Sequence, residues 1–528
     1  MSGRLALDFG TSNTVLARWD DVSRSASTVL VPDYGGPLGP DLPPVVPSLI
    51  HYEPEQRRWL GRQVLQQNLY SSPRTFRWMK RYIANRSPLK LKLEDREVSP
   101  AEAGRDFLST LLAMAVAELG SPEEEVAFTL PVECFEHYEE WLGSVAETAG
   151  IHRFRFIDEP SAAALGYGSH IQAGDVYLIF DLGGGTLDVS AVKVEDQDQG
   201  GWRRCRVLGK AGADLGGATF DQWLFEEVLR QNQLKDYDEE VRRLSRALLV
   251  ECERAKERLS FHPEAEISLM NPDTGGMVSA RFTQADFERL LDEKEAFRII
   301  DQTLRRALRG AHERGFDEES IKSVLLVGGS TLIPAVQRTL HRIFGREKVL
   351  LDRPIDAVAR GAAAFVSGTD FYDHIQHDYG IRHVNASGTY DYRVIVPRGT
   401  AYPTSEPVAR LVIKGFYDGQ THLGLALFEL GESRKRTTAA GGPIELVFDG
   451  TGAARLRPVS ADDEERRSMF WMNENQPTFL EANPPAKKGE PRFEALFSVD
   501  GNKRLLLTAR DLVTGKLVYR DYPVVKLS

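Results

Sequence analysis

The clearest pattern of hydrophobic and polar positions in the chain is a short apolar run that ends in an acid and a glycine turn. Residues 176–180 (VYLIF) are five consecutive apolar residues, which predicts a buried strand that ends at Asp181. Three glycines follow at 183–185, and a second strand-like stretch begins at Thr186. We therefore expect a β-hairpin with a tight glycine turn.

A stretch near the N-terminus repeats this order. Residues 5–16 read as an apolar strand that ends in Asp8, a small-residue turn that begins at Gly10, and a second strand. Two such hairpins far apart in the chain predict a duplicated α/β domain that clamps a phosphate between its halves. The alternative is that two ordinary hairpins share the pattern by coincidence.

The residue types at these turns indicate a chemistry. Backbone N–H groups of a glycine turn can approach an anion closely, because no Cβ atom stands in the way. A carboxylate at the end of the neighbouring strand suits a hydrated divalent metal. A phosphate and a metal together indicate a nucleotide, although a glycine-rich hairpin alone is weak evidence for one.

Helical spacing dominates the remainder of the first two thirds of the chain. One helix is predicted from Ser99, whose partner in a capping box is Glu102, and a second over 135–149. A long helix at 238–260 carries an apolar stripe at Leu244, Leu248, Cys252, Ala255 and Leu259. Two further glycine turns, within 213–221 and 324–334, each precede a predicted helix. Residues 357–364 are predicted to form a small-residue helix suited to close packing.

Three sets of polar residues in these elements are candidates for chemistry. Lys80 lies in a segment of apolar and basic residues, where a solvated surface lysine is the alternative. Glu159 follows a predicted strand, where it could simply be the acidic first turn of a helix. Glu253, Lys256 and Ser260 share one face of the long helix, and a solvated salt-bridged face is their alternative.

After about residue 366 the helical spacing disappears and short β-like runs dominate. This predicts a separate all-β domain. The predicted strands are 392–396, 409–414, 423–430, 444–448, 493–499, 505–509 and 517–519. Residues 451–490 are polar and contain a charged run and prolines, so we interpret them as a long excursion from this domain.

Composition and charge narrow the class of protein. The 528 residues allow two or more domains, and the net charge of −11 argues against a nucleic-acid or anionic-membrane partner. Cys134, Cys205 and Cys252 are scattered, which favours reduced thiols in a cytoplasmic protein. The N-terminus enters a strand without the pattern of a signal peptide, and no apolar run is long enough to span a bilayer.

The motifs taken together resemble the nucleotide-binding domain of the 70-kDa heat-shock protein family. They are DFGTSNT, DEPSAAALGYG, FDLGGGTLDV, ADLGGATFD, ECERAKERLS and VLLVGGSTLIPAVQ, in the family's order and spacing. The resemblance implies an actin-like ATPase domain with two ribonuclease H-like halves over 1–366. It further implies a linker at 367–380 and a β-sandwich substrate-binding domain at 381–528, which is expected to lack the family's helical lid.

The resemblance also implies roles for individual residues. Asp8 and Asp181 would hold Mg²⁺ through water, with K⁺ as a further candidate ion. Lys80, Glu159, Thr186 and Asp181 would be the catalytic set, with Asp188 as a further candidate carboxylate. The nucleotide, ATP or ADP, would be bound by Gly10, Thr11, Ser12, Asn13, Gly183, Gly184, Gly185, Thr186, Gly216, Gly217, Glu253, Lys256, Ser260, Gly328, Gly329 and Ser330. Leu423 would line a substrate pocket in the β-domain, unless it is an ordinary core leucine.

Two departures from the family concern the base of the nucleotide. The family usually holds adenine between two arginines, and the matching positions here are Glu257 and Leu332. Loss of both cation–π contacts, each about 0.5–2 kcal/mol, would weaken nucleotide binding or relax the preference for one base.

Other departures concern communication between the domains. Pro131 matches the family's switch proline, but Glu139 stands where its partner arginine is usual. Arg155 matches a residue that the family uses toward J-domain co-chaperones, but Asp158 replaces a nearby asparagine. The segment 368–380 is shorter and more polar than the family's leucine-rich linker.

The function that the resemblance implies is a slow Mg-dependent ATPase that acts as a chaperone for unfolded or extended polypeptide segments. A J-domain protein and a nucleotide-exchange factor would be its partners. One alternative is an ATP-switched adaptor for a dedicated partner with little turnover. A sugar kinase and a filament protein of the same fold are further alternatives, and the predicted β-domain argues against both.

Overall fold

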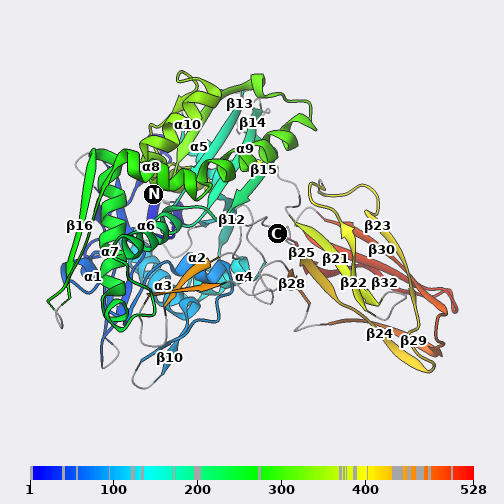
Figure 1. Ribbon diagram of the computed structural model, residues 1–528. Helices are drawn as coiled ribbons and strands as arrows, with labels where there is room; N and C mark the ends of the chain where they lie inside the picture. Colours follow the sequence, from blue (N-terminus) through cyan, green and yellow to red (C-terminus); the bar gives the residue numbers. More distant parts are fainter. Residues whose placement is uncertain are drawn as a thin grey trace. The chain divides into compact units, whose positions relative to one another are not determined.

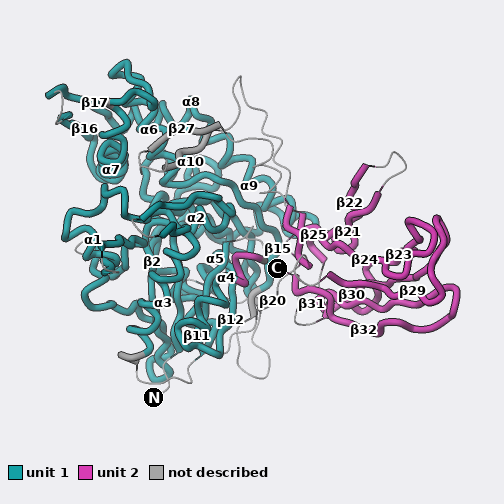
Figure 2. The backbone as a smooth tube through the Cα atoms, turned by 90° about the horizontal axis from the view of Figure 1, so that it is seen from below, with its two compact units in different colours: residues 1–132, 141–372, 441–458 teal, residues 133–140, 373–440, 459–528 magenta. Residues whose placement is uncertain are grey.

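The computed structural model of the protein divides into two compact units (Figures 1 and 2). Unit 1 comprises residues 1–132, 141–372 and 441–458, and unit 2 comprises 133–140, 373–440 and 459–528. The structure describes residues 4–527 except for 39–41, 55–56, 94–95, 120–124, 132–135, 169–170, 173, 196–203, 272–274, 368–370, 373–374, 376, 385–388, 401, 431–443, 449–453, 459–468, 474–476 and 501–502. No helix among these residues is long and apolar enough to cross a membrane.

The first sheet of unit 1 is built on the N-terminal hairpin. Strands β1 (Arg4–Phe9) and β2 (Asn13–Asp20) are antiparallel, and Asp8 lies opposite Val15. The sheet order is β12-β11-β1-β2-β5-β4, and β3 also pairs with β2. The bounds of these other strands are β3 Ser25–Thr28, β4 Gly36–Pro37, β5 Pro44–Pro47, β11 Val126–Leu130 and β12 Phe154–Asp158. Strands β11 and β12 run parallel to β1.

The second sheet of unit 1 repeats this order around the second hairpin. Strands β13 (Val176–Leu182) and β14 (Leu187–Glu195) are antiparallel, and Asp181 lies opposite Asp188. The order is β19-β18-β13-β14-β15-β20, with β18 parallel to β13 and β19 parallel to β18. The remaining bounds are β15 Arg204–Ala213, β18 Ile321–Val327, β19 Val349–Leu350 and β20 Phe371–Tyr372. Both predicted hairpins are confirmed, and unit 1 is α/β as expected.

Two small-residue helices pack between these sheets. Helices α5 (Glu159–Gly166) and α11 (Ala357–Val366) share one buried cluster with side chains from both sheets. A Cβ atom at Gly166 would lie 1.8 Å from the carbonyl oxygen of Ala357, and one at Gly361 would lie 1.6 Å from that of Ala162. Only glycine permits this approach, which confirms the predicted close packing.

The other helices of unit 1 lie outside this pair, and α9 (Ala296–His312) packs against β14 and β15 of the second sheet (Figure 1). Their bounds are α1 Arg62–Gln66, α2 Met79–Ala84, α3 Pro100–Leu119, α4 Glu136–Thr148, α6 Gly217–Gln231, α7 Glu239–Phe261, α8 Gln284–Glu293, α9 Ala296–His312 and α10 Pro334–Phe344. The predicted stripe of α7 is buried in the main core, from Leu244 to Leu259. Ser99 and Glu102 form the predicted capping box at α3.

Besides its two main sheets, the described part of unit 1 has four smaller β structures, one of which, at 444–458, is described below with the β region. Strands β7 (Arg58–Leu60), β6 (Ile50–Tyr52) and β8 (Thr75–Phe76) form one, and β9 (Leu91–Lys92) pairs with β10 (Glu97–Val98). The hairpin of β16 (Glu264–Met270) and β17 (Met277–Thr283) follows α7 directly.

The described residues of unit 2 after Ile375 form strands and turns without a helix, as predicted. One sheet has the order β22-β21-β25-β28, a second β23-β30-β31-β32, and β24 pairs with β29. The bounds are β21 Asp378–Val384, β22 Tyr390–Val396, β23 Ala409–Lys414, β24 Gln420–Leu425, β25 Leu427–Leu430, β28 Met469–Trp471, β29 Thr478–Ala486, β30 Pro491–Val499, β31 Arg504–Asp511 and β32 Leu517–Lys526. Their inward side chains form one apolar core.

Several details of the β region differ from the prediction. The single strand expected at 423–430 is divided at Ala426, because β24 pairs with β29 whereas β25 pairs with β21 and β28. The polar excursion expected at 451–490 was wrong for its described residues, which contain β27 (Ala454–Pro458), β28 and β29. The prolines of β29 are tolerated because it pairs on only one side, with β24.

One predicted strand of the β-domain belongs to unit 1 instead. Strand β26 (Ile444–Phe448) pairs with β27, and residues 441–458 group with unit 1. The backbone N–H of Leu456 donates to the carboxylate of Asp236 over 3.1 Å. Within the predicted linker, β20 pairs with β15 of unit 1 and β21 begins at Asp378. The domain boundaries at 366 and 381 stay predictions.

Candidate functional site

The glycine turn between β13 and β14 lies directly against the turn between β1 and β2. A Cβ atom at Gly184 would lie 2.6 Å from the hydroxyl oxygen of Ser12, and one at Gly185 would lie 2.5 Å from that of Thr11. These distances are shorter than van der Waals contact, so a side chain at Gly184 or Gly185 would displace the hydroxyl of Ser12 or Thr11. The structure therefore brings together the two hairpins that the sequence places far apart.

Two further glycine turns fix this loop from the other side. The N–H groups of Gly217 and Ala218 donate to the carbonyl oxygens of Gly183 (3.0 Å) and Gly184 (2.7 Å). The Ser330 hydroxyl also donates to the Gly183 carbonyl, over 2.9 Å. Three segments that are distant in the sequence thus hold the glycine turn at 183–185 in a defined position.

A cavity of about 270 Å³ lies where these segments meet. Nearly all of the predicted nucleotide-site residues line it: Asp8, Gly10, Thr11, Ser12, Asn13, Lys80, Glu159, Asp181, Gly183, Gly184, Gly185, Thr186, Gly217, Glu253, Lys256, Ser260, Gly328, Gly329 and Ser330. Gly216 does not line the cavity but packs behind the loop, where its Cβ would lie 2.7 Å from the carbonyl carbon of Gly185. Leu423 belongs to unit 2 and is buried in its core.

One wall of the cavity gathers buried charges. The Lys80 ammonium forms an ion pair with Glu159, and both side chains are more than nine-tenths buried. Asp8 accepts a hydrogen bond from the Thr129 hydroxyl over 2.8 Å, and Asp181 is also buried. Lys80 is therefore not a solvated surface lysine, and Glu159 does more than cap a helix, because the N-cap of α5 is Asp158.

Burial of several acids together raises their pKa values. Burial raises the pKa of Asp181 well above its usual value, and the negative charges of Glu159, Asp188 and Asp8 raise it further. Burial also raises the pKa of Glu159 to about 7, although the Lys80 charge opposes this shift. Burial also raises the pKa of Asp8, and the charge of Lys80 and the hydrogen bond from Thr129 offset part of this rise. The cluster thus has more buried negative charge than Lys80 balances.

This charge imbalance is what a divalent cation would correct. Two carboxylates beside glycine turns of the kind that can approach a phosphate, with water completing the shell, suit Mg²⁺. Among the described residues, no three acidic, histidine or cysteine side chains converge closely enough to bind one ion by themselves. The donor set therefore fits an ion held by Asp8 and Asp181 through water together with the phosphates of a nucleotide.

We expect binding of Mg²⁺ and ADP to release protons at neutral pH. The raised pKa values leave part of the cluster protonated near pH 7, and a bound cation would favour the ionised carboxylates. Affinity should therefore increase from about pH 6 to about pH 8. Calorimetric titration in two buffers of different ionisation enthalpy measures the protons released, and Glu159→Gln should release fewer. Equal binding heats in both buffers would contradict this expectation.

The stability of the ligand-free protein should fall with rising pH, whereas nucleotide affinity should increase. A carboxyl group whose pKa is raised to about 7 on folding stabilises the fold while it is protonated. This contribution is complete below the ordinary value of 4.5 and is lost as the pH rises through about 7. Thermal unfolding without ligand should therefore reveal a smaller loss of stability over this range for Glu159→Gln than for the unaltered protein.

The opposite wall of charged residues comes from α7. Glu253 accepts from the Arg77 guanidinium over 2.9 Å and from the Tyr70 hydroxyl. Lys256 forms an ion pair with buried Asp221 over 2.8 Å and also donates to the Gly217 carbonyl. Glu253, Lys256 and Ser260 thus face the cavity rather than bulk solvent, which decides against the alternative of a solvated helix face.

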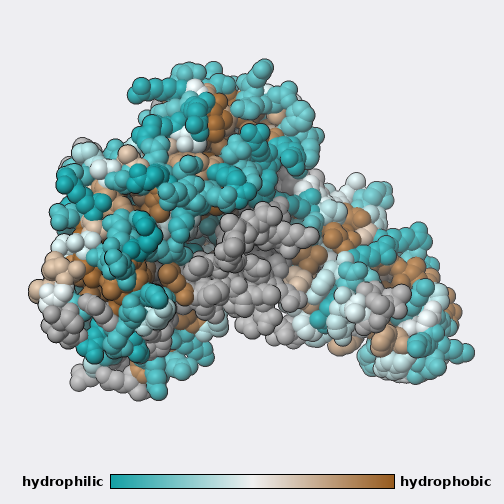
Figure 3. Space-filling model, in the orientation of Figure 1, coloured by the Kyte–Doolittle hydropathy of each residue, from teal (hydrophilic) through white to brown (hydrophobic). Residues whose placement is uncertain are grey.

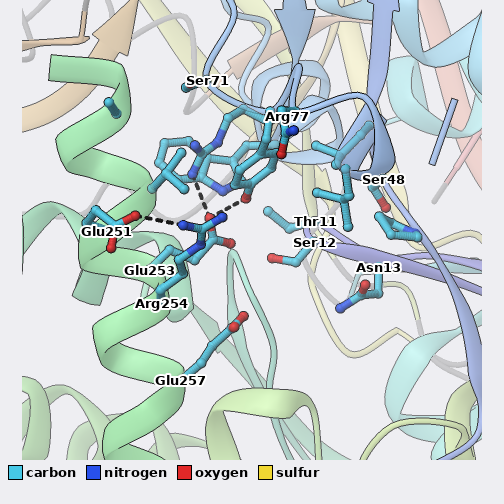
Figure 4. Close-up of a pocket in the computed structure, with 18 of the residues that line it drawn as sticks. Thr11, Ser12, Asn13, Ser48, Ser71, Arg77, Glu251, Glu253, Arg254 and Glu257 are labelled. Carbon is cyan, nitrogen blue, oxygen red and sulfur yellow. Dashed lines mark hydrogen bonds and ion pairs between the residues drawn. The ribbon is translucent and has the colours of Figure 1, made fainter. Parts of the chain in front are cut away.

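A second cavity of about 470 Å³ adjoins this one (Figure 4). The two share Thr11, Ser12, Asn13, Glu253 and Glu257, among other residues. In Figure 4, Glu257 extends from α7 toward the turn that carries Thr11 and Asn13. The two cavities are therefore parts of one larger hollow, with the carboxylates of Glu253 and Glu257 at their junction.

Sequence reasoning missed several residues that shape this site. Tyr70 and Arg77 hold Glu253, and Asp221 holds Lys256. A signal existed for Arg77, which lies three residues before Lys80, and for Asp221, which ends the motif ADLGGATFD. No signal marked Tyr70, because its contact with Glu253 spans 183 residues of sequence.

Comparison with known proteins agrees with this geometry. The family model described as Hsp70 protein matches residues 5–370, which is more than half of the chain. The protein named "Chaperone protein DnaK" from Thermosipho melanesiensis is 28% identical over 535 residues, which covers 97% of this chain and 78% of that protein. The chain therefore belongs to the Hsp70 family.

Proposed function

We propose that the protein is an ATP-dependent chaperone in which unit 1 is an actin-like, duplicated ATPase and unit 2 a β-sandwich that binds polypeptide. Membership of the Hsp70 family supports an ATP-hydrolysing chaperone in general. The observation that carries the finer proposal is the Lys80–Glu159 ion pair beside Asp8 and Asp181, in a cavity lined by both glycine hairpins. The repeated strand order of the two sheets supports the duplication.

The nucleotide is held by residues from several segments. The turns at 10–13 and 183–186 offer backbone N–H groups to the phosphates. Glu253 and Lys256 accept and donate hydrogen bonds to the ribose, while Ser260 and the turn at 328–330 contact the nucleoside. Asp8 and Asp181 would hold Mg²⁺ through water, and the ion would supply positive charge that neutralises the phosphate oxygens.

The residues at the phosphate end suit hydrolysis by water. The water oxygen bonds to the γ-phosphorus as the bond to the bridging oxygen of ADP breaks. Glu159, whose pKa is about 7, accepts the proton of this water, and the Thr186 hydroxyl orients it. The Lys80 ammonium stabilises the charge that develops on the transferred phosphoryl group. We expect hydrolysis to be slow, because the Lys80 ammonium and the Glu159 carboxylate are paired with each other before they act on the reacting groups.

Unit 2 supplies the proposed polypeptide site. Its exposed aromatic residues offer apolar contacts for an extended segment of an unfolded protein: Phe416, Tyr417, Phe479 and Tyr522. Leu423 is only 3% exposed and packs in the core, so its part in a substrate pocket stays a prediction. A J-domain protein and a nucleotide-exchange factor remain the proposed partners, and the cytoplasm the proposed location.

The test is single-turnover ATP hydrolysis by the full chain with and without a permanently unfolded polypeptide, such as reduced and carboxymethylated lactalbumin. We expect the polypeptide to increase the rate by about 5-fold, because binding at unit 2 is coupled to unit 1. Bound ATP that is never hydrolysed would contradict the ATPase.

A rate that does not respond to polypeptide would favour the second candidate, an ATP-switched adaptor for one dedicated partner. The grouping of residues 441–458 with unit 1, although both flanking segments belong to unit 2, is the observation that favours it. A dedicated contact of this kind suits a fixed assembly better than a general chaperone. The sugar-kinase and filament alternatives gain no support from the comparisons.

A further inference from the structure

One end of the nucleotide cavity lies apart from the acid cluster. It is lined by Glu257, Ser260, Phe261, Leu332 and Ile355, and we call these residues the base end. Glu257, Ser260 and Phe261 come from the last turns of α7, whereas the acid cluster comes from β1, α2, α5 and β13. A nucleotide whose phosphates lie at the proposed position beside Lys80 and Glu159 would extend its base toward this end of the cavity.

The base end contains an aromatic ring with a free face. Phe261 is the last residue of α7, and it is 66% exposed although it lines the cavity. Because the ring is both exposed and part of the cavity wall, a planar ligand in the cavity can reach its face. A planar base that stacks on such a ring gains about 10-fold in affinity.

The cations near the base end are already engaged. Lys256 pairs with Asp221, Arg254 with Glu251, and Arg77 with Glu253. Glu257 is the remaining charged side chain on this part of α7 that lines the cavity, and none of the contacts drawn for the described residues in Figure 4 joins it. The base end is therefore acidic, and it favours the N–H groups of a base over its carbonyl oxygens.

We infer that the base end selects purines by stacking on Phe261 and by hydrogen bonds from base N–H groups to the Glu257 carboxylate, and that it accepts guanine nucleotides as readily as adenine nucleotides. This rests on the proposed nucleotide site and specifies its substrate class. Guanine presents a ring N–H and an amino group on one edge, which a carboxylate accepts together. Adenine presents only its amino group, and uracil presents one N–H between two carbonyl oxygens.

The test is calorimetric titration of the full chain with ADP, GDP, IDP and UDP in the presence of Mg²⁺. Diphosphates avoid turnover during the measurement. We expect GDP and ADP to bind within about 3-fold of each other, IDP about 5-fold more weakly than GDP because it lacks the amino group, and UDP at least about 10-fold more weakly.

Variants at two positions separate the contributions. Glu257→Gln should weaken GDP by about 10-fold and ADP by less than about 3-fold, because one amide oxygen cannot accept both guanine N–H groups. Phe261→Leu should weaken the binding of both ADP and GDP by about 10-fold, whereas Phe261→Tyr should bind both with normal affinity. Arg258→Gln is the matched control, because Arg258 is exposed on the same turn of α7 but lines neither cavity.

The outcomes distinguish this inference from the proposed function. Binding of ADP with GDP more than about 100-fold weaker would overturn the inference and leave the ATPase intact. Equal binding of GDP by Glu257→Gln and by the unaltered protein would overturn the role of the carboxylate. Failure of all four diphosphates to bind would contradict the proposed function itself.

Discussion

Lys80→Ala should reduce the single-turnover rate of ATP hydrolysis by about 100-fold or more. The Lys80 ammonium is buried beside Glu159, Asp8 and Asp181, and it opposes the rise in the pKa of each of these acids. Its removal takes away the cation that stabilises charge on the transferred phosphoryl group. It also raises the pKa of Glu159 further, so less of that carboxylate can accept the proton of water.

Lys210→Met is the matched control for this prediction. Lys210 forms a buried ion pair with Asp158, the residue next to Glu159, over 3.2 Å, but it does not line the nucleotide cavity. Loss of this pair should lower the free energy of unfolding by roughly 3 kcal/mol. Hydrolysis by the folded protein should stay within about 5-fold of normal. A Lys80→Ala protein that binds ATP and hydrolyses it within about 5-fold of normal would contradict the proposed mechanism.

Gly216→Ala should weaken the binding of Mg²⁺ and ADP by about 100-fold, although Gly216 itself does not line the cavity. An added Cβ atom would lie 2.7 to 2.8 Å from backbone atoms of Gly184 and Gly185, which no side-chain rotation can relieve. The phosphate-binding turn or the start of α6 must therefore move. Displaced N–H groups lose their alignment with the phosphates, and calorimetric titration measures the loss.

Gly183→Ala provides the comparison within the same loop. Its Cβ atom would meet nothing closer than 3.9 Å, which is ordinary van der Waals contact. We expect it to bind ADP within about 5-fold of normal. If both variants bind alike, close packing of the loops is not what positions the phosphate site. Thermal unfolding of both proteins shows whether either change acts through loss of the fold.

The sequence by itself determined the local elements of this protein. Apolar runs that end in Asp8 and Asp181, followed by glycine, predicted both hairpins, because a strand and a tight turn depend on neighbouring residues. The apolar stripe of α7 and the small residues of α11 predicted helices that pack in the core for the same reason. The motifs also indicated nearly all of the residues that line the nucleotide cavity.

Only the tertiary structure decided which of these residues act together. The contacts of Lys80 with Glu159 and of Arg77 with Glu253 span 79 and 176 residues of sequence, so no local pattern records them. The burial of Lys80 also depends on distant segments. So does the burial that raises the pKa of Glu159 to about 7. The grouping of β26 and β27 with unit 1 is a further case, because alternation along a strand specifies its pleat and not its partner.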